Sequence, residues 1–251
     1  MTDKKIPFVG LHAHSVAGSI FDAIGYPNEH MDFCYENGGE ALALTDHGNM
    51  NGFSHQFLHW QKMKAEGKEF KPIFGVEAYF LPSIDEWREE YDRIKEDAKL
   101  AKTLAKAGDT SGATVEDEEA SKKAVKSVIN RRRHLVLLAQ NQTGLNNLFK
   151  LISESYREEN FYRYPRVDYK LLDKYSEGVI AASACLGGPY AGNYWANREE
   201  GPEAVRAAMR ETSREFVEVF GDRWYGELQW NNIPEQHELN QYIIETCKEF
   251  D

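Results

Sequence analysis

Two histidines near the N-terminus, His12 and His14, are the first residues in the chain that suggest chemistry. Side chains at positions i and i+2 of an extended backbone point to the same side. The apolar run Ile6–Leu11 comes directly before them and predicts a strand that ends at this pair. Two neighbouring imidazoles can bind one divalent metal ion, and neutral imidazole suits zinc, manganese or iron. The alternative is a pair of surface histidines.

Further residues of the metal-binding types follow other strand-like runs. They are Asp22 in the loop after the histidine pair, Asp46 and His47 after Ala41–Leu44, Glu77 after Pro72–Val76, and Cys185 after Val179–Ala182. In parallel α/β folds the carboxyl ends of the strands carry the functional site. We therefore expect these side chains to lie together. Nitrogen and carboxylate ligands in such a cluster suit two or three metal ions that hold a phosphate and activate water.

His134 does not fit this pattern, because it begins its apolar run, His134–Leu138, and does not end it. Parallel strand geometry alone places it at the opposite edge of the sheet, which predicts a surface or supporting histidine. The remaining histidines fall in helix-like segments and are interpreted as structural. They are His30, His55, His59 and His237.

The elements that must position these residues alternate along the chain. The predicted strands are Ile6–Leu11, Ala41–Leu44, Pro72–Leu81, Leu135–Ala139, Gly178–Ala182 and Trp224–Leu228, and the predicted helices are Pro27–Glu36, Asn51–Glu66, Thr143–Tyr156, Pro202–Phe220 and Pro234–Phe250. Short apolar runs between amphipathic helices are typical of a parallel α/β fold. Another strand would be due after Asp251, so we expect this chain to be a fragment.

A charged segment interrupts the alternation. Residues 84–133 are rich in Glu and Lys around a Gly108–Gly112 hinge, which predicts a solvated helical insertion that projects from the fold. The segment ends in Arg131, Arg132 and Arg133. This run is either a phosphate-binding or nucleic-acid-binding group or a solvated face.

Composition limits the class of protein. The chain has 251 residues, 41% of them hydrophobic, and a net charge of −11. Proteins that bind DNA without sequence preference are usually basic, so a metal site or another domain must attract any nucleic acid. The chain has no apolar run of transmembrane length and no signal-peptide pattern. Its cysteines, Cys34, Cys185 and Cys247, form no CxxC motif, which favours a reduced cytoplasmic protein.

A series of segments then stands out by its order along the chain. The segments are Leu11–Ser15, Ala41–Gly48, Pro72–Glu77, His134–Ala139, Gly144–Leu148, Ser183–Gly188 and Trp224–Gln229. Together they resemble the polymerase and histidinol phosphatase (PHP) domain at the N-terminus of C-family replicative DNA polymerases, the DNA polymerase III alpha subunits of bacteria and phages. The Cys-Leu-Gly-Gly segment at Cys185 favours the polymerase branch over stand-alone phosphatases.

The resemblance implies a distorted seven-stranded (βα) barrel, similar to a TIM barrel, with a cleft at one end that holds two or three divalent ions (Zn, Mn, Fe or Mg). Carried over by motif, the ligands are His12, His14, Asp22, His47, Glu77, His134 and Cys185. Asp46 is implied as a catalytic or supporting neighbour. The resemblance thus implies that His134 is a ligand, although strand geometry places it at the opposite edge of the sheet. The family completes its site with an Asp-x-His segment on a later strand, so residues 1–251 are expected to form an incomplete PHP domain with 84–133 inserted in it.

The implied function is that of the PHP domain of a DNA-directed DNA polymerase, with 3′–5′ exonuclease (proofreading) chemistry in the complete protein. A stand-alone phosphoesterase that acts on a small phosphate ester is one alternative. A non-catalytic module that stabilises the polymerase or docks a partner is another. The expected partners are DNA, the other polymerase domains, an exonuclease subunit and a sliding clamp, with no membrane. The expected location is the bacterial cytoplasm, with a bacterial or a phage gene as the source.

Overall fold

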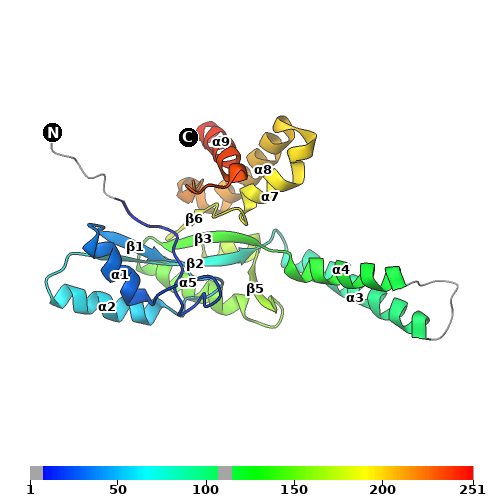
Figure 1. Cartoon of the computed structure of the whole chain (residues 1–251), viewed down its shortest axis with the longest axis horizontal. Helices are drawn as coiled ribbons and strands as arrows, with labels where there is room; N and C mark the ends of the chain where they lie inside the picture. The colour runs from blue at the N-terminus through cyan, green and yellow to red at the C-terminus, as the bar shows by residue number, and fades with distance from the viewer. Residues whose placement is uncertain (1–7, 107–114, 251) are drawn as a thin grey trace.

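A mixed β-sheet forms the centre of the protein (Figure 1). The computed structural model describes residues 8–106 and 115–250. The strands are β1 (Ala41–Leu44), β2 (Lys71–Phe80), β3 (Arg133–Ala139), β4 (Phe161–Tyr162), β5 (Tyr164–Val167), β6 (Val179–Ala182) and β7 (Trp224–Tyr225). They are paired in the order β4-β5-β2-β3-β6-β7, and β1 pairs with the first half of β2. The α/β class expected from the sequence is confirmed.

Helices surround this sheet and extend from it. They are α1 (Pro27–Glu36), α2 (Phe53–Ala65), α3 (Ile84–Lys106), α4 (Val115–Asn130), α5 (Gln142–Ser155), α6 (Tyr169–Tyr175), α7 (Pro189–Asn197), α8 (Pro202–Phe220) and α9 (Pro234–Glu249), with 3₁₀ turns at Arg198–Glu200 and Gly221–Arg223. The predicted bounds of α1 and α8 agree with the structure. In both helices Pro is the first residue, where its fixed φ and missing N–H do no harm. The short elements α6, α7, β4 and β5 were not predicted.

The expectation of an all-parallel sheet is wrong. Strand β3 is antiparallel to both β2 and β6, whereas β2 is parallel to β1 and β5. The reason lies in the connection from β2 to β3. Helix α3 leads away from the end of β2, and α4 lies beside it in a projecting arm and leads back (Figure 1). The chain thus returns to the same end of β2, where Phe80 is paired with Arg133. Such a return connects antiparallel neighbours, since a parallel pair needs a crossover. The predicted hinge at Gly108–Gly112 lies outside the described residues.

The two faces of the sheet are covered differently. One face of β2, β3 and β6 packs on α5, α6 and α8 in a core that includes Leu137, Leu148 and Phe216. Helices α7, α8 and α9 form a separate lobe with its own apolar centre. The other face of the sheet carries a smaller apolar cluster around Val136 and Leu138. Beside that cluster lies an open cavity of about 1260 Å³. A polar site can therefore form on this second face.

The N-terminal strand differs from expectation, and the predicted barrel is not confirmed. In place of a strand at Ile6–Leu11, the described part of this run makes one bridge, from Gly10 to Leu42, and Ile6 lies outside the described residues. Strand β7 is also shorter than predicted. Within residues 8–106 and 115–250 no strand pair closes the sheet into a barrel. Segment 10–13 is instead bound beside β1, where Ala43 N donates to Gly10 O and Thr45 N to Ala13 O.

The central position of β3 leads to a stability prediction. Leu137 is fully buried on the helix-covered face, so Leu137→Ala should lower the free energy of unfolding by about 2–5 kcal/mol through lost contacts and a cavity. Leu100→Ala on α3 is the control, because that side chain is 61% exposed. Urea unfolding measures both. Equal stability of the two variants would contradict this placement of β3.

Candidate metal centre

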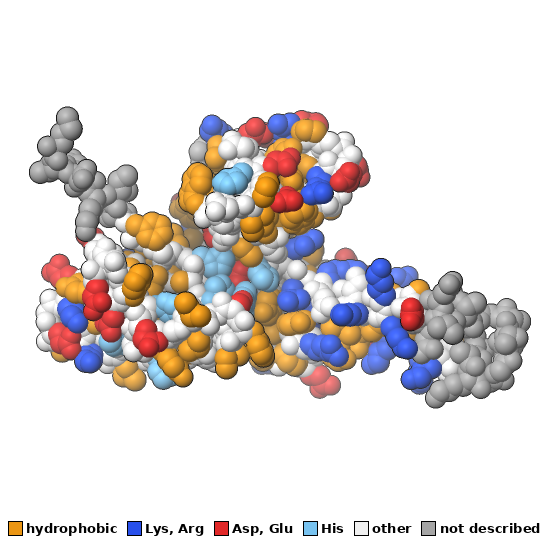
Figure 2. All heavy atoms as spheres, viewed as in Figure 1, with side chains coloured by type: hydrophobic (Ala, Val, Ile, Leu, Met, Phe, Trp, Pro, Cys, Tyr) orange, Lys and Arg blue, Asp and Glu red, His pale blue; other side chains and the backbone are white. Residues whose placement is uncertain are grey.

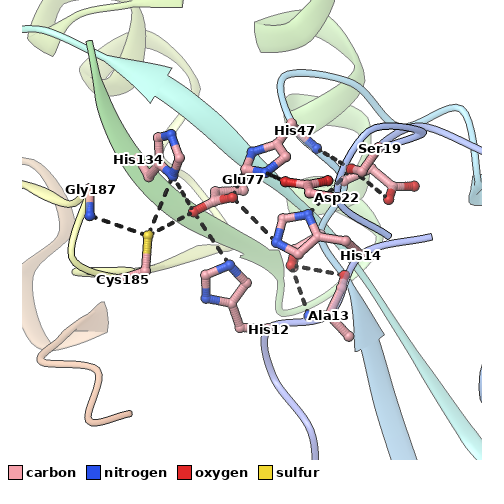
Figure 3. A network of polar contacts seen from close by, with 12 residues as sticks. His12, Ala13, His14, Ser19, Asp22, His47, Glu77, His134, Cys185 and Gly187 are labelled. Carbon is pink, nitrogen blue, oxygen red and sulfur yellow. Dashed lines mark hydrogen bonds and ion pairs between the residues drawn. The ribbon is translucent and has the colours of Figure 1, made fainter. Parts of the chain in front are cut away.

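The carboxylate of Glu77 is the centre of the site (Figure 3). Glu77 lies within β2 and is completely buried. Each of its oxygens faces two imidazole nitrogens. Oε1 lies 3.0 Å from His134 Nδ1 and 3.3 Å from His12 Nε2, and Oε2 lies 2.8 Å from His47 Nδ1 and 3.4 Å from His14 Nε2. Four predicted ligands from three parts of the sequence thus converge on a fifth.

Strand direction explains why His134 belongs to this group. Because β3 is antiparallel to β2, the beginning of β3 lies beside the end of β2, and His134 is paired with Tyr79. The strand-geometry prediction that placed His134 at the opposite edge is therefore wrong. Strand β6 is antiparallel to β3 in turn, so its carboxyl end, which leads to Cys185, returns to the same edge.

The histidine pair reaches the site without a strand. The rings of His12 and His14 have centroids 5.1 Å apart and lie on the same side of the chain, as the i, i+2 spacing predicted. Hydrogen bonds between Ala13 and Thr45 hold this segment beside β1. Asp22 comes from the following loop, and its Oδ2 lies 2.6 Å from Nε2 of His47. Asp22 therefore belongs to this site, and it contacts the site through His47.

Cys185 lies on the other side of Glu77. Its Sγ is 3.4 Å from His134 Nδ1 and 3.8 Å from Glu77 Oε1, and it accepts a hydrogen bond from Gly187 N. The residue before it, Ala184, is buried and has a φ of 56°. A residue with a side chain rarely adopts this left-handed conformation, and such strain is concentrated at functional sites. The tight turn after β6 directs the thiol toward the histidines.

Asp46 holds the loop that carries the site but does not face Glu77. Its buried carboxylate accepts hydrogen bonds from the backbone N–H of Ser15 and from the hydroxyls of Ser15 and Ser19. Ser19 Oγ in turn lies 3.2 Å from His14 Nδ1 and accepts from the N–H of His47. These contacts indicate a positioning residue.

Glu227 is a residue of the site that the sequence motifs did not reveal. Its Oε1 lies 2.7 Å from His12 Nδ1 and accepts a hydrogen bond from Gln229 Nε2. The backbone N–H of Glu227 donates to Ser183 Oγ, which fixes this segment at the end of β6. An acidic residue within the predicted strand Trp224–Leu228 was the available signal. The observed strand ends at Tyr225, so Glu227 lies in the segment that follows it.

The charges of the site shift the pKa values of its members. Burial raises the pKa of Glu77, but the nearby imidazoles of His12, His134 and His47 outweigh it and hold that pKa far below its usual range. Burial lowers the pKa of His12, yet Glu227 and Glu77 raise it to about 10. The pKa of His47 is raised, because Glu77 and Asp22 outweigh burial, whereas burial lowers the pKa of His14. Burial and the charge of Glu77 raise the pKa of the Cys185 thiol to about 11.

These residues fit a metal ion. The described residues offer three overlapping ligand groups, each with its ligand atoms within 4.8 Å of one another: His12, His14 and Glu77; His14, Asp22 and His47; and His47, Glu77 and His134. His47 Nδ1 and Glu77 Oε2 are buried and close, but neither has an aligned hydrogen-bond partner. Buried polar atoms without partners are rare and require an explanation, such as an ion. A divalent cation between these atoms would satisfy both.

The three arginines do not act as one group. Arg131 is exposed and forms a two-pronged ion pair with Glu90. Arg133 lies against Gly192 of α7, on the side of the lobe. Arg132 stacks on the rings of Tyr79 and Tyr164. Figure 2 shows one group of histidine side chains between the sheet and the lobe, with basic side chains toward the α3–α4 arm.

Comparison with known proteins agrees with this geometry. The profile described as "PHP domain" matches residues 10–231. The chain belongs to the PHP domain family. The family resemblance read from the sequence motifs is thereby confirmed.

Curated relatives of this PHP domain are named DNA polymerase III subunit alpha. Those from Aquifex aeolicus, Borreliella burgdorferi and Campylobacter jejuni are 37%, 33% and 32% identical over 97%, 96% and 96% of this chain. The chain spans 17% of the length of each. It therefore matches one part of these polymerases. None of its described helices has the length and apolar character needed to cross a membrane.

The contact between Glu227 and His12 predicts a pH dependence in the metal-free protein. A histidine whose pKa is raised on folding stabilises the fold below its unfolded pKa of 6.5, and this contribution is lost as pH rises toward about 10. Glu227→Gln removes the anionic partner of His12, so the free energy of unfolding should fall less as pH rises. Urea unfolding between pH 6.5 and 10 measures the effect. Glu158→Gln, an exposed carboxylate, is the control, and parallel curves for all three proteins would refute the assignment.

Asp46 leads to a second prediction. Asp46→Asn keeps the size of the side chain but removes its charge and one strong acceptor, so the loop with Ser15 and Ser19 should loosen. We expect metal affinity to fall about 10- to 100-fold, the usual effect of losing a supporting contact. Asp32→Asn, whose carboxylate contacts His59 instead, is the matched control. Titration with a metal-sensitive dye measures affinity, and unchanged affinity in Asp46→Asn would contradict its positioning role.

Proposed function

We propose that this PHP domain binds two or three divalent metal ions and hydrolyses phosphodiester bonds, as the 3′–5′ exonuclease centre of a DNA polymerase III alpha-type protein. The observation that supports it most is the arrangement of Glu77. Both oxygens of one buried carboxylate face imidazole nitrogens, so Glu77 would hold the ions together with these histidines. Membership of the PHP family and the polymerase relatives also support a phosphodiester substrate.

The chain supplies several kinds of ligand to such ions. His12, His14 and Glu77 would hold one ion, and His47, His134 and Glu77 another, with Asp22 beside His47. The Cys185 thiol would join the second group as a thiolate, which favours zinc or iron over magnesium. When bound, the ions supply an activated water and stabilise negative charge on the phosphate and the leaving oxygen.

The remaining residues keep this arrangement in place. Glu227 accepts from His12 Nδ1 and so leaves Nε2 directed at Glu77. Asp46 fixes the loop after His14 through Ser15 and Ser19. A carboxylate behind a ligating histidine is the usual device for fixing its tautomer and orientation. We assign Asp46 and Glu227 to positioning rather than to contact with substrate.

We infer that the sheet is part of the distorted PHP-type barrel, with residues 84–133 as an insertion. Segment 10–13 lies beside β1, and His12 also contacts Glu227, which follows β7. The two ends of the sheet are thus connected through side chains around the cavity of about 1260 Å³. This contact supports a nearly closed barrel.

The proposed partners follow from the relatives. DNA would reach this domain through a longer polymerase, whose other domains would be its direct neighbours. An exonuclease subunit and a sliding clamp are further proposed partners, and the bacterial cytoplasm is the proposed location. The Arg131–Arg133 segment is proposed to contact nucleic acid through Arg132, because Arg131 is already paired with Glu90 and Arg133 lies against α7.

Metal content tests the proposal directly. Elemental analysis of the protein purified without chelator should find at least one bound transition metal per chain, and His14→Ala and Glu77→Gln should each reduce it. His55→Ala is the matched control, because His55 is exposed on α2, outside the site. The metal-loaded protein should hydrolyse a single-stranded oligonucleotide from its 3′ end faster than a small phosphate monoester.

The other outcomes separate the competing functions. Faster hydrolysis of the monoester would favour the stand-alone phosphoesterase. Bound metal with no hydrolysis of either substrate, also in a longer polymerase, would favour a structural module, which the net charge of −11 suits. Metal content unchanged in His14→Ala and Glu77→Gln would refute the site itself.

A further inference from the structure

Arg132 differs from Arg131 in having no carboxylate partner for its charge among the described residues. Arg131 is neutralised by Glu90, but among the described residues no carboxylate forms an ion pair with Arg132. Its Nη1 donates to the backbone oxygen of Asn130, and its buried Nε has no acceptor. In a chain of net charge −11, an unpaired guanidinium with a free donor is unusual.

Aromatic stacking holds this guanidinium in place. Arg132 Cζ lies 3.9 Å from the ring centroid of Tyr164 and 4.9 Å from that of Tyr79. The two tyrosine rings are perpendicular neighbours, with centroids 5.5 Å apart. A stacked guanidinium loses little further freedom when it binds an anion, and its planar donors match phosphate oxygens. The arrangement is therefore pre-organised for phosphate.

The stack adjoins the metal centre. Tyr79 follows Glu77 by two residues in β2, so both side chains are on the same face of the sheet. The Tyr79 ring stacks on His47, with centroids 5.9 Å apart, and lies 5.6 Å from the ring of His134. One aromatic ring thus separates Arg132 from two of the proposed ligands.

We propose that Arg132, stacked on Tyr79 and Tyr164, binds a phosphate of the substrate next to the phosphate that is cleaved at the metal centre. This inference rests on the proposed function and makes it more specific. A nucleic acid strand has a second phosphate to place there, whereas a small monoester has none. Arg132 therefore selects for a polynucleotide, and Tyr164 offers an aromatic surface to the same strand.

Two arginine variants test the assignment by binding alone. Arg132→Met keeps an apolar stem against the tyrosines but removes the charge. It should weaken binding of a single-stranded phosphorothioate oligonucleotide at least about tenfold, since hydrogen bonds to charged groups contribute strongly. The slope of log K against log salt should fall by about 0.7, the value for one phosphate contact. Arg131→Met should bind as the wild type does, because Arg131 is already paired with Glu90.

Kinetics and a conservative variant exclude a merely structural effect. With the metal-loaded protein, Arg132→Met should raise KM for the oligonucleotide at unchanged kcat and leave hydrolysis of a small monoester unaffected. Arg132→Lys keeps the charge but not the planar fork, so its affinity should be intermediate. Thermal unfolding of each variant checks that the fold is intact.

Distinct results would overturn the inference and the proposed function. Equal oligonucleotide affinity in Arg132→Met and the wild type, equal losses in both arginine variants, or no oligonucleotide binding by the wild type would overturn the role of Arg132. An equal effect on the monoester would indicate a contact with the cleaved phosphate instead, and would overturn the adjacent position. Absence of metal and of hydrolysis in the wild type would defeat the proposed function, whatever the binding results.

Discussion

A single buried charge, the carboxylate of Glu77, is the constraint on which the rest of the site depends. Burying an ionised carboxylate in a protein core is unfavourable unless charged or strongly polar partners surround it. Here four imidazoles do so, and they come from the N-terminal segment, from the turn after β1 and from the start of β3. Each segment must therefore approach β2 closely. The loops of the site are in this sense organised by an electrostatic requirement at the middle of one strand.

The projecting arm of α3 and α4 has a role in this arrangement that its charged surface does not suggest. Because the arm leaves and re-enters at one end of the sheet, β3 runs antiparallel to β2 and begins beside Tyr79. That reversal places His134 at the site and returns the end of β6, with Cys185, to the same edge. An ordinary crossover helix at this point would have put His134 on the opposite side.

Local sequence was a good guide to the elements and a poor one to strand direction. The apolar runs at β1 and β6 and the helices that begin with Pro27 and Pro202 were predictable, because their periodicity and caps are local. The direction of β3 was not, because it depends on a connection of more than 50 residues whose path is set by packing. His134 was expected at the site because of the resemblance to the PHP domain, and not because of strand geometry. Glu227 was missed because its role depends on a contact with His12, 215 residues away.

Protons and metal ions are alternative partners for the same buried carboxylate. Without a metal, protonated imidazoles balance Glu77, which is why the pKa values of His12 and His47 are raised while that of Glu77 is depressed. A metal needs the same nitrogens in their neutral form, so binding must displace those protons. The contact from Glu227 favours protonated His12, yet it also holds the ring with Nε2 toward Glu77. The acidic neighbours thus do two things at once: they favour the protonated imidazoles in the metal-free protein, and they hold the rings toward Glu77, where a metal would bind.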